Sequence, residues 1–214
     1  MPNGKSMAGA GEQKPVRRGK TANQRADAQR NRARILAAAP DAFRKDPDAS
    51  VADIAAEAGI GRMTLYGHFK TRAELIEAAL VESIEKGDEV LADVPLDGDP
   101  ASALQRLIAS SWTLVDRSRA LLAAAQKELP ASRIREMHEK AEARMRGLLL
   151  RGQREGAFRS DLPLTWLLTT AHVVMNGAAE EARAGRLEPD DAPWFIQAVL
   201  LPAFARPPGV ETAS

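Results

Sequence analysis

The segment GIGRMTLYGHF, residues 59 to 69, combines residue types that can bind phosphate groups. Two glycines one residue apart precede a basic and a hydroxyl side chain, Arg62 and Thr64. Such a loop can cradle the phosphates of a nucleotide, and the same letters can be the tight turn of a DNA-reading helix pair. The two interpretations lead to different kinds of protein, so the sequence context has to decide between them.

The nucleotide interpretation fails on its context. A dinucleotide-binding fingerprint needs a preceding strand, a third glycine and an acidic residue further along the chain. Here Thr64 holds the position of the third glycine, and the residues before Gly59 have helical periodicity. The sequence GKS at residues 4 to 6 fails as a Walker motif because only three residues precede it. A helix, a glycine-bearing turn and a second helix remain.

Other catalytic or metal-binding patterns are missing from the sequence. Neither G-x-S-x-G nor H-E-x-x-H occurs, and the three histidines, His68, His138 and His172, are too scattered to predict a metal site from spacing. The absence of cysteine excludes disulfides and cysteine-based zinc sites and fits a reducing cytoplasm. We therefore expect a cytoplasmic protein that is not an enzyme and that holds no metal and no cofactor.

The charge is unevenly distributed, although the whole chain has a formal net charge of only +1. Residues 1 to 36 contain nine Lys and Arg against two Asp and Glu, a net charge of +7, so the remainder sums to −6. A basic arm on an acidic body predicts a polyanionic partner, most simply nucleic acid, although a solubilising disordered tail explains the arm equally well. Arg30 and Arg34, one turn apart, fit a solvated face as well as a phosphate clamp.

Helical signals follow one another from about Thr21 to residue 204, and no convincing strand is found, which predicts an all-α fold. Capping boxes at SVAD (residues 50 to 53) and TRAE (residues 71 to 74) each begin a helix, and Gly59 ends the first of them. Pro40 is expected to bend the first helix. The further helices expected are a short one from Arg62 to about His68, then 100 to 116, 118 to 128, 132 to 155, 162 to 183 and 190 to 204.

The short helix that starts at Arg62 has an unusual outward face. Projected at about 100° per residue, Leu65 and Phe69 face inward. A solvated surface normally carries Lys or Glu, whereas a thioether, a hydroxyl, a phenol and a bare backbone suit close approach to base edges in a major groove about 12 Å wide. The outward and flanking positions are Met63, Gly67, Thr64 and Tyr66.

The stretch from Arg34 to Leu80 resembles the N-terminal domain of the TetR family of bacterial transcriptional repressors. The resemblance is carried by RILAAAPDAF and by SVADIAAEAGIGRMTLYGHFKTRAELIEAAL, and the rest of the chain is similar in its helical layout and in RGQREGAFRSDLP. The family implies a three-helix DNA-binding head with a helix-turn-helix, joined to a helical body that binds a ligand and dimerises. The expected divisions are a flexible basic arm (1–20), the head (21–70), the body (71–205) and a disordered tail (206–214).

The resemblance also implies roles for single residues of the head. Ser50 would touch phosphate, and Arg72, where the family usually has lysine, would make a second phosphate contact. Gly61, Met63 and Gly67 depart from the usual residue types, which affects the expected operator sequence more than DNA binding itself. The recognition positions are Arg62, Met63, Thr64, Tyr66, Gly67 and His68.

The last two predicted helices are apolar nearly all round, so their surface is difficult to cover within one chain. We expect them to form a homodimer contact, which in the family is a four-helix bundle, and two heads predict a roughly palindromic operator. The uncharged stretch from 162 to 179 contains Pro163, His172 and Asn176, so we interpret it as buried helix and expect no membrane contact.

An inducer pocket is expected among the middle helices. His172 and Asn176 lie one turn apart on an otherwise apolar helix and need polar partners, which a ligand or the second subunit would supply. Met and Trp at helical spacing usually pack as core, which is the alternative for most of the other candidates. The candidates are Trp112, Met137, His138, Met145, Trp166, His172, Met175 and Asn176.

These observations favour a repressor that an unknown small-molecule inducer releases from double-stranded DNA. Two alternatives stay open from the sequence: a helical dimeric interaction module without sequence-specific DNA binding, and an activator that binds a small molecule. A steep salt dependence combined with a sequence preference separates DNA readers from the interaction module.

Overall fold

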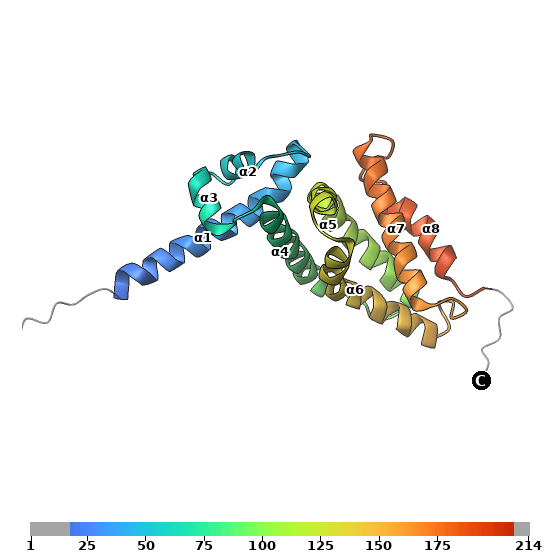
Figure 1. Cartoon of the computed structure of the whole chain (residues 1–214). Helices are drawn as coiled ribbons and strands as arrows, with labels where there is room; N and C mark the ends of the chain where they lie inside the picture. The colour runs from blue at the N-terminus through green and yellow to red at the C-terminus, as the bar shows by residue number, and fades with distance from the viewer. Residues whose placement is uncertain (1–17, 208–214) are drawn as a thin grey trace, which may run out of the picture.

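The structure, a computed structural model, describes residues 18–207, apart from the side chains of residues 18–23, 140 and 141. Over this range the chain has one isolated bridge, between Phe158 and Ala205, and no strand, so the all-α prediction is confirmed (Figure 1). The helices are α1 (Arg18–Lys45), α2 (Val51–Glu57), α3 (Arg62–His68), α4 (Arg72–Ala92), α5 (Pro100–Glu128), α6 (Ala131–Arg154), α7 (Leu164–Arg183) and α8 (Ala192–Phe204).

Local sequence signals set the limits of helix α2. The capping box is confirmed: Ser50 Oγ accepts a bond from the Asp53 amide at 3.3 Å, and Asp53 Oδ2 accepts from the Ser50 amide at 2.8 Å. The Ser50 hydroxyl and then its amide hold the pKa of Asp53 below the ordinary value, because both bonds favour the charged carboxylate. Gly59 follows the helix with a φ of +63°, a conformation that costs glycine little.

The second capping box forms only in part. Thr71 Oγ1 accepts from the Glu74 amide at 3.0 Å, as the sequence predicts. The Glu74 carboxylate accepts from the Lys70 amide at 2.7 Å instead of from Thr71. Both bonds still satisfy amides at the start of α4, which therefore begins at Arg72.

Two expected helix limits are wrong. Helix α1 begins at Arg18, so residues 18 to 20, assigned to the flexible arm, are helical, and the rest of that arm lies outside the described residues. The expected helices 100–116 and 118–128 are the single helix α5. Neither Gly nor Pro interrupts the sequence between them, and an ion pair between Asp116 and Arg119 spans the expected break.

The described residues form two hydrophobic cores that share the helices α4 and α5. The head core unites α1, α2 and α3 with the first half of α4, and it also contains Leu121, Ala124 and Ala125 from the end of α5. The body core contains the first half of α5 together with α6, α7 and α8, and Leu91 from the end of α4. Both helices therefore pass from one core into the other, and a tilt of α5 would change the packing of both cores.

Candidate nucleic-acid interface and body pocket

Helix α3 is fixed by two buried anchors and turns a bare face outward. Leu65 and Phe69 are 0% and 1% exposed in the head core, which matches the helical projection. Met63 is 82% exposed, and Gly67 is exposed with open space where a side chain would be. With Thr64 also exposed, this side of α3 lets another molecule approach the helix backbone closely.

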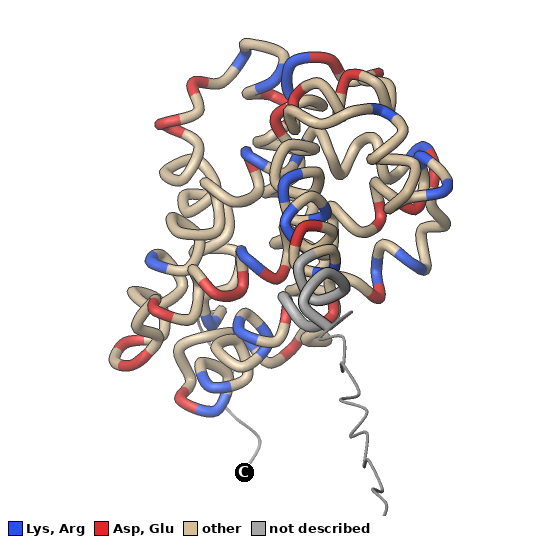
Figure 2. The backbone as a smooth tube through the Cα atoms, turned by 90° about the vertical axis from the view of Figure 1, so that its left-hand side faces the viewer, with Lys and Arg blue, Asp and Glu red and all other residues tan. Residues whose placement is uncertain are grey.

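Arginines pack over aromatic rings beside α3. The guanidinium carbon of Arg62 lies 5.5 Å from the ring centre of Tyr66, and that of Arg32 lies 4.6 Å from the ring centre of Phe69. Both arginines stay exposed, so their charge is available to an anion. Lys and Arg are interleaved with Asp and Glu over the molecule (Figure 2), but residues 18–70 contain ten Lys and Arg against six Asp and Glu, which makes the head net basic.

Arg34 fastens the turn that precedes α3. Its Nη2 donates to the Gly59 carbonyl oxygen at 3.1 Å, and a Cβ at residue 59 would lie only 2.9 Å from that nitrogen. The Arg34 side chain is flexible and can move aside, so it is the positive φ of residue 59 that favours glycine here. Arg30, one turn earlier on α1, pairs with Asp27 at the surface.

The Ser50 hydroxyl is already occupied in the structure. It donates to Asp53 Oδ2 at 2.6 Å while it accepts from the Asp53 amide. A phosphate that took the hydroxyl proton would have to displace this charged acceptor. Helix capping is thus the role of Ser50 that the geometry supports, and a phosphate contact stays a prediction.

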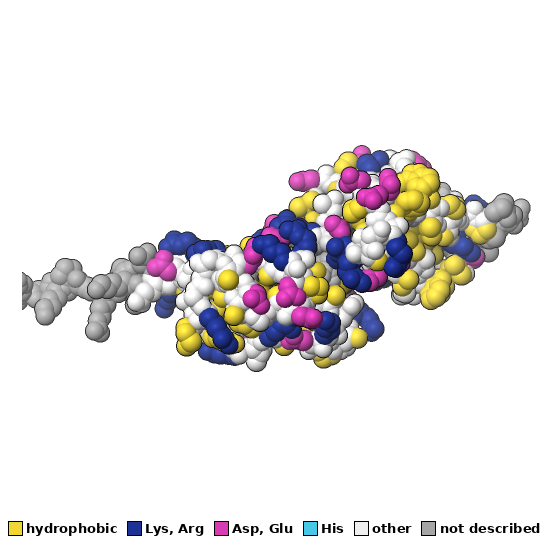
Figure 3. Space-filling model, turned by 90° about the horizontal axis from the view of Figure 1, so that it is seen from above, with side chains coloured by type: hydrophobic (Ala, Val, Ile, Leu, Met, Phe, Trp, Pro, Cys, Tyr) yellow, Lys and Arg dark blue, Asp and Glu magenta, His cyan; other side chains and the backbone are white. Residues whose placement is uncertain are grey.

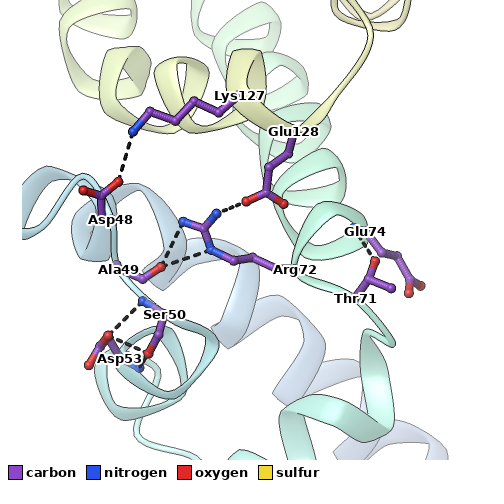
Figure 4. Close-up of polar contacts among 9 residues, drawn as sticks. All are labelled: Asp48, Ala49, Ser50, Asp53, Thr71, Arg72, Glu74, Lys127 and Glu128. Atoms are coloured by element: carbon purple, nitrogen blue, oxygen red, sulfur yellow. Dashed lines mark hydrogen bonds and ion pairs between the residues drawn. The ribbon is translucent and has the colours of Figure 1, made fainter.

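Arg72 joins the head to the end of the body helix α5 (Figure 4). Its Nε and Nη2 donate to the Ala49 carbonyl oxygen at 3.3 and 3.1 Å, and its Nη1 forms an ion pair with Glu128. The guanidinium carbon also lies 5.3 Å from the ring centre of Phe43. The Arg72 and Glu128 side chains are 29% and 24% exposed, so water and salt screen this pair less than a surface pair. We call Arg72, Ala49 and Glu128 the latch.

A second ion pair lies beside the latch but is fully at the surface. Lys127 Nζ is 3.0 Å from Asp48 Oδ1, and the two side chains are 63% and 84% exposed (Figure 4). Both pairs link consecutive residues at the end of α5 to the region where α1, α2 and α4 meet. Their different burial makes Lys127 and Asp48 an internal reference for the latch.

A pocket of about 200 Å³, here called the body pocket, lies between α4, α5, α6 and α7 and is lined mainly by aliphatic groups. The rings of His138 and His172 meet there edge to face, with 5.6 Å between their centres. His138 Nδ1 lies 2.8 Å from the Ile134 carbonyl oxygen, so this nitrogen carries the proton and donates. Burial lowers the pKa of His172, the neighbouring His138 lowers it further, and Glu142 opposes both effects.

Helices α7 and α8 present an exposed apolar face at one end of the molecule (Figure 3). Its two largest exposed side chains are Trp194, 66% exposed, and Trp166, 58% exposed. An apolar surface of this kind on a globular domain marks a contact site. The α7–α8 face consists of Trp166, Val173, Trp194, Phe195 and Val199.

Residues 18–207 offer neither a metal site nor a membrane-spanning helix. No three or more acidic or histidine side chains come together in a way that could hold a metal ion. No helix in this range combines the length and the apolar composition needed to cross a membrane.

A comparison with known proteins places the head in a family. The family model described as "Bacterial regulatory proteins, tetR family" matches residues 35–79, which run from α1 into α4 and include α3. The HTH-type transcriptional regulator TtgR of Pseudomonas putida is 37% identical over 87 residues. The head is similar to the TetR family. The sequence match to TtgR covers 38% of this chain and 41% of TtgR, less than half of either.

The TetR likeness extends to the body in solved structures. FadR of Bacillus halodurans, titled a fatty acid degradation regulator, gives a TM-score of 0.65 at 17% identity and covers 84% of this chain and 99% of FadR. LfrR of Mycobacterium smegmatis, solved in complex with proflavine, gives 0.62 at 22% identity, covering 84% of this chain and 99% of LfrR. At these identities the likeness establishes the fold of the body and no more.

The structure brings five of the eight predicted ligand-binding residues together. The candidates that line the body pocket are His138, Met145, His172, Met175 and Asn176. The sequence could not place His138 beside His172, because the two lie on different helices far apart in the chain.

Three other candidates lie outside the body pocket, so this pocket gives their predicted ligand-binding role no support. Trp112 is packed in the body core and is 5% exposed, whereas Met137 packs against the head core. Trp166 lies on the exposed α7–α8 face. An apolar side chain on a helix can face the core, a pocket or the surface. Helical spacing alone does not predict which of these three environments it occupies.

The latch was missed by reasoning from the sequence. Arg72 was assigned to a DNA phosphate, but all three of its guanidinium nitrogens bond to Ala49 or Glu128 within the chain. The phosphate contact therefore requires the latch to open. Only the arginine in place of the family's usual lysine signalled this role, since a planar guanidinium can serve two acceptors at once.

Proposed function

We propose that the chain is a DNA-binding transcriptional regulator that places α3 in the major groove of an operator. The observation that carries this proposal is the bare outward face of α3, where Met63 and Gly67 are exposed while Leu65 and Phe69 anchor the helix from behind. A helix presented in this way can bring its side chains and backbone close to base edges. Arg62 adds a positive charge at the start of the helix, where phosphates would approach.

We also propose that the chain acts as a homodimer through the α7–α8 face. Burying this face against a second copy removes large apolar side chains from water, which is the main driving force of such contacts. A two-fold dimer carries two copies of α3, so its operator is roughly palindromic with half-sites about 34 Å apart.

A small molecule in the body pocket is proposed to control DNA binding. In this proposal the unliganded dimer occludes a promoter in the bacterial cytoplasm, and an inducer favours a different separation of the two heads. The ligand can shift this equilibrium only by the difference in its affinity for the two states. No catalytic role is assigned to any residue.

Selection from a randomised duplex pool with the intact protein tests the DNA-binding proposal. We expect enriched sequences with two-fold symmetry, and binding that weakens steeply with salt because several phosphates are neutralised. Unselective binding at every salt concentration would leave only a helical dimeric interaction module. A small molecule that strengthens binding to the selected operator would make the protein an activator-type or corepressed regulator instead of an induced repressor.

The substitution Gly67→Ala tests the face of α3 without disturbing the head. A Cβ at residue 67 meets no atom within 4 Å, so alanine fits the fold and stabilises the helix by about 0.5–1 kcal/mol. Gly147→Ala in α6 is the matched control, because a Cβ there also meets nothing within 4 Å. We expect both variants to be at least as stable as the parent, but only Gly67→Ala to lose about tenfold or more in operator affinity. Equal affinity of both variants would show that α3 does not lie against the bases.

A further inference from the structure

A second pocket of about 140 Å³ lies beside the body pocket, between α1, α4 and α5. Its wall includes Leu36 and Pro40 of α1, whereas no residue of α1 lines the body pocket. The second pocket therefore reaches the head. Four residues line both pockets, namely Ser83, Gly87, Leu114 and Ser118.

Leu114 of α5 is one of these four residues, and its side chain lies against Gly87 of α4. A Cβ at residue 87 would lie 3.3 Å from Leu114 Cδ1, so the leucine side chain rests against the α4 backbone in the space that Gly87 leaves. Leu114 is only half-buried, and its side chain lies between two open volumes. Leucine has more than one staggered rotamer, so a change of rotamer would move the Leu114 side chain relative to both volumes.

We propose that the two pockets are one elongated ligand site divided by Leu114, and that a ligand reaches α1 only if it is long enough to displace this side chain. This proposal rests on the proposed function, in which the body pocket binds the regulatory ligand. It adds a length requirement to that function. A short ligand fills the body pocket alone, and a long one also touches the helix that carries the head.

The lining of the two compartments indicates the chemical class of the ligand. The body pocket is mainly aliphatic and suits an apolar chain or ring. The second compartment has a more polar mouth, formed by the ion pair of Glu82 with Lys86 at 2.9 Å and by the exposed Arg117. In the same wall, Pro40 has no N–H to donate to the Leu36 carbonyl oxygen, which therefore lacks its usual helical donor. The site therefore fits an elongated amphipathic molecule with a polar end.

A series of 1-alkanols from hexanol to dodecanol tests the divider in the intact protein, by displacement of the fluorescent probe N-phenyl-1-naphthylamine. Each buried methylene raises affinity about fourfold, so affinity rises with chain length until the alkanol meets Leu114 and then levels off. In Leu114→Ala we expect the rise to continue, with dodecanol bound at least about tenfold tighter than by the parent and hexanol within about twofold. Leu114→Phe enlarges the divider and should make affinity level off at a shorter chain.

Val115→Ala is the matched control, since Val115 lines the body pocket but not the second one. It should change the affinity of all alkanols by a similar factor and leave the levelling-off length unchanged. Hydrogen exchange of the α1 peptide that contains Leu36 and Pro40 gives a second readout. Dodecanol bound to Leu114→Ala should protect this peptide, and hexanol should not.

Two results would overturn the inference, and they are distinguishable. If Leu114→Ala and Leu114→Phe level off at the same chain length as the parent, or α1 gains no protection, then Leu114 divides nothing and the proposed function stands. If no alkanol displaces the probe from any variant, the body pocket does not bind apolar ligands. The inference then fails together with the ligand-binding part of the proposed function.

Discussion

Removing the latch tests how firmly the head is joined to the body. Arg72→Ala removes the ion pair with Glu128 and both hydrogen bonds to the Ala49 carbonyl oxygen. Within the described residues, Arg72 supplies the hydrogen bonds that this oxygen accepts. Ala49 is 1% exposed, so its orphaned carbonyl group costs about 1–3 kcal/mol. The lost contact with the Phe43 ring adds about 0.5–1 kcal/mol. We therefore expect Arg72→Ala to lower the free energy of unfolding by about 2–4 kcal/mol.

Glu128→Ala is the milder half of the same experiment. It removes only the ion pair and leaves Arg72 bonded to Ala49. A pair with side chains about a quarter exposed falls between surface pairs, worth about 0.2–1 kcal/mol, and fully buried ones, whose disruption costs about 3–5 kcal/mol. We expect a loss of about 1 kcal/mol and a coupling energy of similar size in the double-mutant cycle with Arg72→Ala.

The assay is urea unfolding of the intact protein at one fixed concentration, because dimer stability depends on concentration. The cycle between Lys127 and Asp48 is the reference, and its coupling should stay below about 0.5 kcal/mol and vanish in high salt. A coupling between Arg72 and Glu128 that is no larger, or that salt removes equally, would refute the reasoning. The salt dependence of operator binding adds an independent result: a phosphate contact by Arg72 would lower its slope by about one in Arg72→Ala, whereas a latch leaves the slope unchanged.

Three further predictions concern the body. His172 has a lowered pKa, so between that pKa and the ordinary value of about 6.5 the unfolded chain binds a proton that the folded chain does not. The free energy of unfolding should therefore fall as pH falls through this window. In denaturation experiments at several pH values, His172→Gln should show a smaller dependence of stability on pH. Gly152→Ala would place a Cβ 2.0 Å from the buried Phe158 ring, so calorimetry should show a loss of about 1–3 kcal/mol or more, and an unchanged Tm would contradict this packing. Trp194→Ala removes an exposed side chain of the α7–α8 face; sedimentation should show a dimer weakened by about 2 kcal/mol with the monomer fold intact, and an unaltered dimer would place the interface elsewhere.

Sequence reasoning succeeded where one local signal decides the structure. The cap at Ser50, the left-handed Gly59 and the buried Leu65 and Phe69 each depend on residues within one or two turns, so spacing alone predicts them. It failed where the outcome depends on contacts between distant segments. Nothing near Glu128 in the sequence indicates that its partner lies at the start of α4.

The continuity of α5 was missed for a related physical reason. The charged and polar residues at 116 to 119 suggested the end of a helix, because an exposed segment in the middle of a helix and a loop have similar composition. In the structure the helix continues and carries Leu121, Ala124 and Ala125 into the head core. Tertiary packing therefore decides the length of this helix, and the sequence pattern reports only which residues are apolar.

The continuous helix α5 connects the body pocket directly to the head. Leu122 lines the pocket and Glu128 belongs to the latch, six residues and about 9 Å further along the same helix. Under the proposed function, a ligand that tilted α5 at Leu122 would strain or open the latch, and an open latch would free Arg72. Linkage requires the effect to be reciprocal, so operator binding has to change ligand affinity by the same factor by which the ligand changes operator affinity. Because the latch joins α5 to the head, a substitution that breaks it should reduce the effect of the ligand on operator affinity, and linkage requires the reverse effect to fall by the same factor.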